Sequence, residues 1–156
     1  MKKLKLYLET TIPNYIFAED TPEKQNATLK FWKKIKTRPY EVFVSEVVVA
    51  EIEKTKDPSK RGKLLRVIEG LPLLELTESC RKFAEVLINE KVIPAEYEPD
   101  ALHIALGVIH QVDAIVSWNL EHIVNIETKL AVRRICQKLG YGEIEIVTPE
   151  EVIAND

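Results

Sequence analysis

At residues 99–106 the chain reads Pro99-Asp100-Ala101-Leu102-His103-Ile104-Ala105-Leu106, and the predicted fold is centred on this stretch. Asp100 suits the N-cap of a helix, because its carboxylate accepts hydrogen bonds from the free amides of a first turn. The apolar residues that recur behind it at helical spacing form one core-facing stripe: Leu102, Ala105, Leu106 and Ile109. Asp100 and His103 project from another side of the same first turn. Taken alone, this pattern favours a helix cap over a catalytic acid.

Short apolar segments alternate with helical segments on both sides of this stretch. We expect strands at 4–8, 41–44, 73–76, 113–117 and 144–147. These segments are apolar on both faces, which is typical of parallel strands covered by helices on both sides. The sequence therefore predicts an α/β fold, a three-layer α/β/α sandwich with a mainly parallel sheet of about five strands. Its 156 residues show no linker and no repeat, so we expect a single domain over 1–156.

The composition is that of an ordinary globular protein. With 46% hydrophobic and 30% charged residues the chain does not resemble a disordered one, and its net charge of -3 argues against indiscriminate nucleic-acid binding. No segment approaches the ~20 apolar residues of a membrane span, and no secretory apolar run follows Met1. Cys80 and Cys136, with no Cys-x-x-Cys motif, fit a reduced protein. We expect a cytoplasmic protein with no membrane association.

Four oxygen-bearing side chains fall where a parallel sheet binds its ligands. Glu9 follows the first predicted strand, and Asn119 follows the fourth. Glu51 lies in the helix after the second strand, and Asp100 begins the helix before the fourth. Right-handed crossovers bring such positions to the carboxyl edge of the sheet. Three carboxylates with no basic residue among them repel one another unless a cation intervenes, and oxygen ligands favour Mg²⁺ or Mn²⁺. Such a site suits metal-assisted hydrolysis of a phosphodiester.

Four motifs follow one another along nearly the whole chain. They are Tyr7-Leu8-Glu9-Thr10-Thr11-Ile12-Pro13-Asn14, Ser45-x5-Glu51, Asp100-Ala101-Leu102-His103-Ile104-Ala105 and Ser117-Trp118-Asn119-Leu120-Glu121-His122-Ile123. In this order they resemble PIN-domain proteins, and among these the ribonuclease toxins of VapBC toxin–antitoxin modules. The resemblance implies a parallel α/β/α fold whose acids bind Mg²⁺ or Mn²⁺ and cleave RNA. It also implies a small VapB-like antitoxin as partner and self-association as a homodimer.

The resemblance assigns roles to individual residues. Glu9, Glu51 and Asp100 would be the metal-binding acids, and Asn119 takes the fourth position of the catalytic set. Thr10 would be the hydroxyl beside the first acid, a ligand of phosphate or of metal-bound water. Two positions depart from the family, since Glu9 stands where aspartate is usual and Asn119 brings an oxygen without a charge. We expect both departures to weaken metal binding, because metal–ligand distances tolerate only ~0.2 Å.

Each of these residues also has a structural interpretation. Glu9 and Glu51 fit solvated positions at a strand end and on a helix surface, because exposed glutamate is the rule. The supporting residues are interpreted as packing or hydrogen-bonding side chains at the edge of the site: His103, Trp118 and His122. Proton transfer by His122 and base stacking by Trp118 are left open. Asp113 precedes the fourth strand, at the opposite end of the sheet, and is excluded from the site.

Basic residues form two clusters. The lysines of residues 30–36 fit an ordinary solvated helix surface. The second cluster follows directly on the helix of Glu51, and its members are candidate contacts to an RNA backbone: Lys54, Lys56, Lys60 and Arg61.

Two functions therefore compete. The first is a Mg²⁺- or Mn²⁺-dependent endoribonuclease, the toxin of a toxin–antitoxin pair. The second is a PIN-fold module that binds RNA or protein and has weakened or lost nuclease activity, in which Glu9→Asp would recover metal binding. A small-molecule phosphatase of another α/β class is disfavoured, because no Asp-x-Asp pair follows the first strand and no phosphate-binding glycine loop is present.

Overall fold

One parallel sheet forms the centre of the computed structural model, which describes residues 3–37 and 39–154. Within these residues five strands are hydrogen-bonded in the order β3-β2-β1-β4-β5. They are β1 (Leu4–Leu8), β2 (Tyr40–Ser45), β3 (Leu73–Leu74), β4 (Ala114–Val116) and β5 (Glu145–Val147). Every neighbouring pair is parallel. The predicted α/β class and parallel sheet are confirmed.

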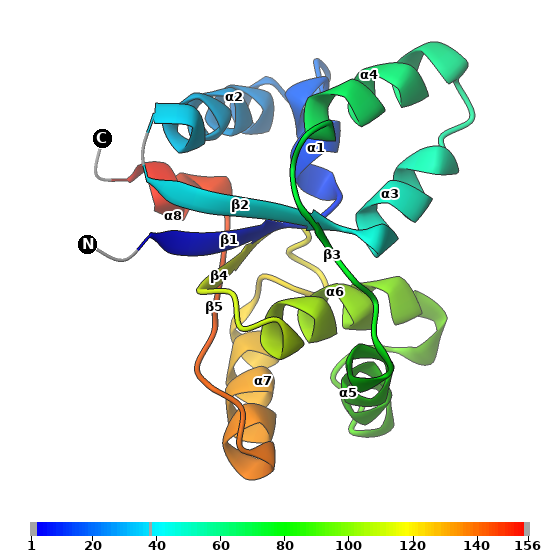
Figure 1. The fold of residues 1–156 in the computed structure, drawn as a ribbon, viewed down its shortest axis with the longest axis vertical. Helices are drawn as coiled ribbons and strands as arrows, with labels where there is room; N and C mark the ends of the chain where they lie inside the picture. The colour runs from blue at the N-terminus through cyan, green and yellow to red at the C-terminus, as the bar shows by residue number, and fades with distance from the viewer. Residues whose placement is uncertain (1–2, 38, 155–156) are drawn as a thin grey trace.

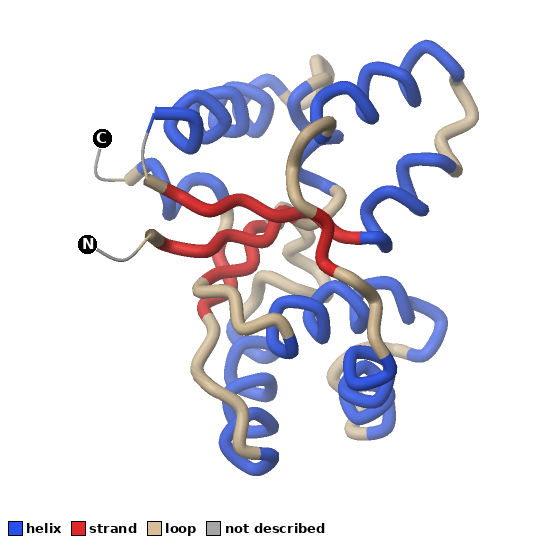
Figure 2. The backbone as a smooth tube through the Cα atoms, viewed as in Figure 1, coloured by secondary structure: helices blue, strands red, loops and turns tan. Residues whose placement is uncertain are grey.

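Helices cover both faces of this sheet (Figures 1 and 2). They are α1 (Thr11–Ile16), α2 (Pro22–Thr37), α3 (Glu46–Glu53), α4 (Pro58–Ile68), α5 (Glu78–Asn89), α6 (Glu98–Ile109), α7 (Ile126–Leu139) and α8 (Pro149–Ile153), with a 3₁₀ helix at Ala95–Tyr97. Figure 1 shows α1, α2 and α4 on one side and α5, α6 and α7 on the other, while α8 packs against α2. None of these helices is long and apolar enough to cross a membrane.

The centre of the sheet is apolar on both faces, as a covered parallel sheet requires. Leu6, Tyr7 and Leu8 of β1 are all buried. Helix α6 is buried from Ala101 to Val108, so the predicted single stripe was too narrow. Gly107 explains this close packing, because a Cβ atom there would lie 2.6 Å from the side chain of Ile115 on β4.

The beginning of α6 differs from the prediction. The helix starts at Glu98, with Tyr97 as its N-cap residue, and Asp100 lies in the first turn. Asp100 as an N-cap is therefore wrong, because Pro99 is tolerated within a first turn and lets the helix begin earlier. The carboxylate remains at the end of the helix where free amides favour negative charge. Side chains do cap two other helices, since the Ser45 hydroxyl accepts from Val48 N and Thr148 forms a capping box.

The strand order determines where a ligand can bind. The chain moves outward from β1 to β2 and β3, and then returns to place β4 on the other side of β1. In open parallel sheets the crevice beyond the carboxyl ends of the strands, where the order reverses, is the usual binding site. Here that position lies beyond β1 and β4, which Glu9 and Ser117 directly follow.

Candidate active site

The backbone places the predicted site residues at the carboxyl edge of the sheet. Glu9 follows β1, and Asn119 follows β4 in a loop that leads to α7. Glu51 lies on α3, which begins directly after β2, and Asp100 lies in the first turn of α6. The four residues that the sequence predicted for the site therefore come from four separate segments around the carboxyl edge of the sheet.

Glu9 is a buried carboxylate that two neighbouring segments hold in place. It is only 4% exposed, so the interpretation of Glu9 as a solvated residue is wrong. Its Oε1 atom accepts from Thr11 N at 3.1 Å, from Thr11 Oγ1 at 2.5 Å and from Ser117 Oγ at 2.8 Å. The Thr11 hydroxyl also accepts from Trp118 N at 2.8 Å. Glu9 thus joins the loop after β1 to the loop after β4.

Glu51 is joined to α6 through His103. The His103 ring is fully buried, and its Nε2 atom lies 2.5 Å from Glu51 Oε1. Thr10 Oγ1 donates to the same oxygen at 2.6 Å. The Glu51 side chain is 33% exposed, so its carboxylate lies at the boundary between the core and the surface. The interpretation of His103 as a hydrogen-bonding residue is confirmed.

Charges at this edge shift the pKa values of both partners. Burial works against the charged form of His103, but the hydrogen bond to Glu51 and the charges of Glu9, Glu51 and Asp100 outweigh it, so the pKa of His103 lies above 6.5. Burial also opposes ionisation of Glu51, yet the hydrogen bond and charge of His103 and the bond from Thr10 hold the pKa of Glu51 below 4.5. All three acids therefore act electrostatically on one imidazole.

Asp100 binds the loop after β4 through His122. His122 Nδ1 lies 2.8 Å from Asp100 Oδ2, and Asn119 Oδ1 accepts from His122 N at 3.0 Å. The ring of Tyr97 lies against the other part of this imidazole, at 4.3 Å between ring centroids. Asn119 N in turn donates to Ser117 Oγ at 2.9 Å, which connects this group to Glu9. His122 therefore orders the loop, as predicted, and it does so through Asp100 as well.

Four residues in this network were missed as site residues. Thr11 and Ser117 hold Glu9, while Tyr7 on β1 contacts both Ser45, at the end of β2, and His103. All four stood inside the motifs, but hydrogen-bond partners 38, 96 or 108 residues apart carry no periodic signal. Only the fold brings them together.

Trp118 packs beneath the site and is not available as a stacking surface. It is 5% exposed, and its indole N–H donates to Thr28 Oγ1 at 2.8 Å. The Tyr15 ring lies 6.0 Å away, and Lys24 Nζ lies 5.7 Å from the indole ring. The packing interpretation of Trp118 is confirmed.

The donor chemistry of the three acids fits Mg²⁺ or Mn²⁺. One oxygen of each carboxylate is held by the chain, and the other has no hydrogen-bond partner within residues 3–37 and 39–154. Among the described residues, no group of three His, Cys, Asp or Glu side chains is placed so that it could already hold a metal ion. Mg²⁺ commonly uses one or two carboxylates together with water and a substrate phosphate, and this donor set suits that mode.

The predicted RNA contacts run from the loop after α3 into the beginning of α4. Lys54, Lys56 and Lys60 are exposed. Arg61 differs, because it is partly buried and its guanidinium donates to the carbonyl of Thr55 at 2.8 Å. The three lysines form the exposed part of this basic segment, and Arg61 fixes the turn that presents them.

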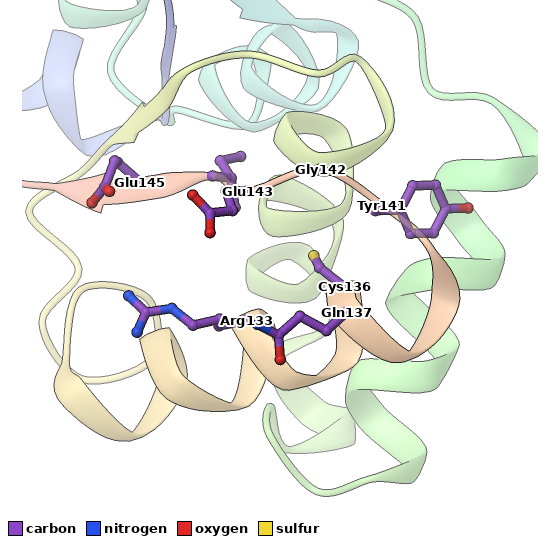
Figure 3. Close-up of a pocket in the computed structure, with 8 residues that line it drawn as sticks. Arg133, Cys136, Gln137, Tyr141, Gly142, Glu143 and Glu145 are labelled. Carbon is purple, nitrogen blue, oxygen red and sulfur yellow. The ribbon is translucent and has the colours of Figure 1, made fainter.

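A separate small pocket of about 60 Å³ lies between α7 and the segment that leads into β5 (Figure 3). Arg133 and Cys136 of α7 face Glu143 and Glu145 across it. None of the residues that line it belongs to the carboxylate network.

Comparisons with known proteins show a likeness of fold. No protein-family model matches the sequence, and a search of curated proteins finds no match. Among solved structures, the chain is similar to one in the crystal structure of VapBC2 from Rickettsia felis bound to a DNA fragment from their promoter. The TM-score is 0.57 at 16% identity, and the match covers 93% of this chain and 98% of the other. The chain therefore shares its fold with a chain of the VapBC2 complex.

Proposed function

We propose that this chain is a metal-dependent endoribonuclease with a PIN-type fold and acts as the toxin of a toxin–antitoxin pair. One observation carries the proposal: Glu9, Glu51 and Asp100 all lie at the carboxyl edge of the sheet, beside its switch point, and their charges act on the buried His103. A purely structural role does not call for three acids at the position where such sheets bind ligands. The motif order and the likeness to a VapBC2 chain support the same proposal.

The acids would hold Mg²⁺ or Mn²⁺ through the oxygens that the chain leaves without partners. When bound, such an ion acidifies water and stabilises negative charge on the phosphate. Thr11 and Ser117 keep Glu9 in one orientation, and Thr10 and His103 do so for Glu51. Because these groups are fixed before substrate arrives, little reorganisation is needed in the reaction.

The loop after β4 would close the site on one side. Asn119 accepts from His122 N, and His122 fixes Asp100, so this loop sets the position of the third acid. Lys54, Lys56 and Lys60 would contact the RNA backbone beyond Glu51, where their charge offsets the net charge of -3.

The partners follow from the same proposal. The similar solved structure is a VapBC2 complex on promoter DNA, which supports an antitoxin as partner of this chain. We further propose self-association as a homodimer and a cytoplasmic location, where RNA is the substrate.

Cleavage of RNA in the presence of Mn²⁺ tests the proposal. Asp100→Asn keeps an oxygen that accepts from His122 but removes the charge, and we expect activity to fall at least about 100-fold. Asp113→Asn is the matched control, because that carboxylate accepts from Lys5 N at the opposite end of the sheet. Cleavage that survives Asp100→Asn would contradict the assignment. Absence of Mn²⁺-dependent cleavage in the wild type would favour the binding module instead.

A further inference from the structure

A buried chain of hydrogen bonds leads away from the site into the core. The Tyr7 hydroxyl lies 2.8 Å from Ser45 Oγ and 2.6 Å from His103 Nδ1. All three side chains are 0% exposed. Burying a hydroxyl among apolar residues is costly, and phenylalanine would fill the same space without that cost. The Tyr7 hydroxyl therefore needs an explanation beyond packing.

The positions of the protons in this hydrogen-bonded chain determine which group His103 presents to Glu51. A tyrosine hydroxyl keeps its proton at neutral pH, because its ordinary pKa is about 10. With a neutral imidazole, Tyr7 donates to Nδ1 and the ring proton stays on Nε2. With a charged imidazole, Nδ1 donates to Tyr7, which donates to Ser45. In both states Nε2–H points at Glu51 Oε1.

We propose that Tyr7 is a positioning residue of the carboxylate site: its hydroxyl fixes the His103 ring, and His103 fixes Oε1 of Glu51. The second oxygen of Glu51 is then left for a ligand. The inference rests on the proposed function in one respect, since that ligand would be Mg²⁺ or Mn²⁺. Without the hydroxyl, the imidazole is free to take the tautomer whose Nε2 lone pair faces the carboxylate, and that arrangement is repulsive.

Direct binding of Mn²⁺, measured by titration calorimetry, tests this role without any assay of cleavage. We expect Tyr7→Phe to weaken Mn²⁺ binding about 10-fold, the lower end of the range for groups behind a metal ligand. Tyr141→Phe is the control, because Tyr141 is exposed and its ring packs edge-on against Phe83 far from the site. An unchanged Mn²⁺ affinity in a folded Tyr7→Phe protein overturns the proposal.

A double variant tests whether Tyr7 acts through His103. His103→Leu removes both ring nitrogens and so breaks the route from Tyr7 to Glu51. We therefore expect Tyr7→Phe to change Mn²⁺ affinity in the wild-type background and to have no further effect in the His103→Leu background. If the losses of Mn²⁺ affinity in the two single variants add up in the double variant, Tyr7 acts by another route and the proposal is contradicted.

The nitrogen NMR signals of His103 separate this inference from the proposed function. In the wild type we expect Nε2 to carry a proton and the Tyr7 hydroxyl proton to exchange slowly and correlate with Nδ1. Tyr7→Phe should alter this pattern even if the wild type binds no Mn²⁺, in which case only the metal site fails. If Tyr7→Phe does not fold, the wild-type spectrum decides, since a rapidly exchanging hydroxyl with no correlation to Nδ1 overturns the proposal.

Discussion

Glu9 stands where the PIN-domain proteins that the sequence resembles usually have aspartate, and its surroundings show how the longer side chain is accommodated. Thr11 and Ser117 place three donors on Oε1, at a distance from β1 that suits glutamate. The residues around Glu9 therefore accommodate its extra methylene group. A carboxylate one methylene shorter would leave the buried Ser117 hydroxyl without this partner.

We expect Glu9→Asp to destabilise the protein by about 1–3 kcal/mol, the cost of leaving a buried polar group unsatisfied. Urea denaturation measures the change. Glu9→Gln is the matched control, because it keeps an oxygen at the Oε1 position and removes only the charge, so it should lose less stability than Glu9→Asp. Improved Mn²⁺ binding in Glu9→Asp would contradict this account and support the binding-module hypothesis, in which aspartate recovers the site.

For single residues, the sequence predicted the positions of the acids but not the side chains that hold them. Strand ends and helix positions follow from apolar patterning, so Glu9, Glu51 and Asn119 could be assigned to one edge. The error at Asp100 arose from a local rule, because a cap was inferred where a first turn continued through Pro99. The partners Ser117 and His122 depend on distances between loops, which no local pattern contains.

Between elements, the His103–Glu51 pair connects α6 to α3 and makes their packing depend on pH. The pKa of His103 is raised from 6.5, so the stabilisation is complete below that pH and is lost as pH rises through the raised pKa. The pKa of Glu51 is lowered from 4.5, so the stabilisation is complete above that pH and is lost as pH falls through the lowered pKa. The pair therefore contributes most between pH 4.5 and 6.5.

We expect the difference in unfolding free energy between the wild type and His103→Gln to be largest in this window and smaller at pH 9. Urea denaturation of the metal-free protein across pH 4–9 measures it. His110→Gln is the control, because the hydrogen bond of that ring goes to the backbone carbonyl of Glu75, at 2.8 Å, and not to a charged side chain. A difference that does not vary with pH would show that His103 contributes through packing alone.

Elements were predicted best where apolar patterning was strong. The five strands and the helices between them were found, whereas β3 is only Leu73–Leu74 and not the four residues expected. Edge strands are paired on one side only, and the backbone after Leu74 turns toward α5, so the apolar run overstated its length. The full burial of α6 also depends on close approach at Gly107, which patterning does not reveal.

The charge distribution of the whole molecule predicts how RNA binding depends on salt. The chain has a net charge of -3, so long-range attraction must come from local groups such as the exposed lysines of residues 54–60, after α3 and at the beginning of α4. We expect replacement of Lys54, Lys56 and Lys60 by glutamine to reduce the slope of log affinity against log salt by about 2, or ~0.7 for each phosphate contact to single-stranded RNA.

Fluorescence anisotropy with a labelled single-stranded RNA measures this slope. The matched control replaces Lys30, Lys33 and Lys36 of α2, which removes the same charge from a different surface. Equal losses in the two triple variants would show that net charge alone governs binding and that residues 54–60 have no special role.

The parallel topology also determines when the site can first exist. Glu9 and Ser117 stand 108 residues apart, and β1 pairs with β4 only after both intervening strands have been made. At ordinary rates of translation, a ribosome needs about 5–20 s to travel from one to the other. Throughout that interval the nascent chain carries its first acid without the hydroxyl that orients it. A nuclease with this topology would therefore be inactive while it is being synthesised. Its activity would begin only after the late C-terminal segment has been made.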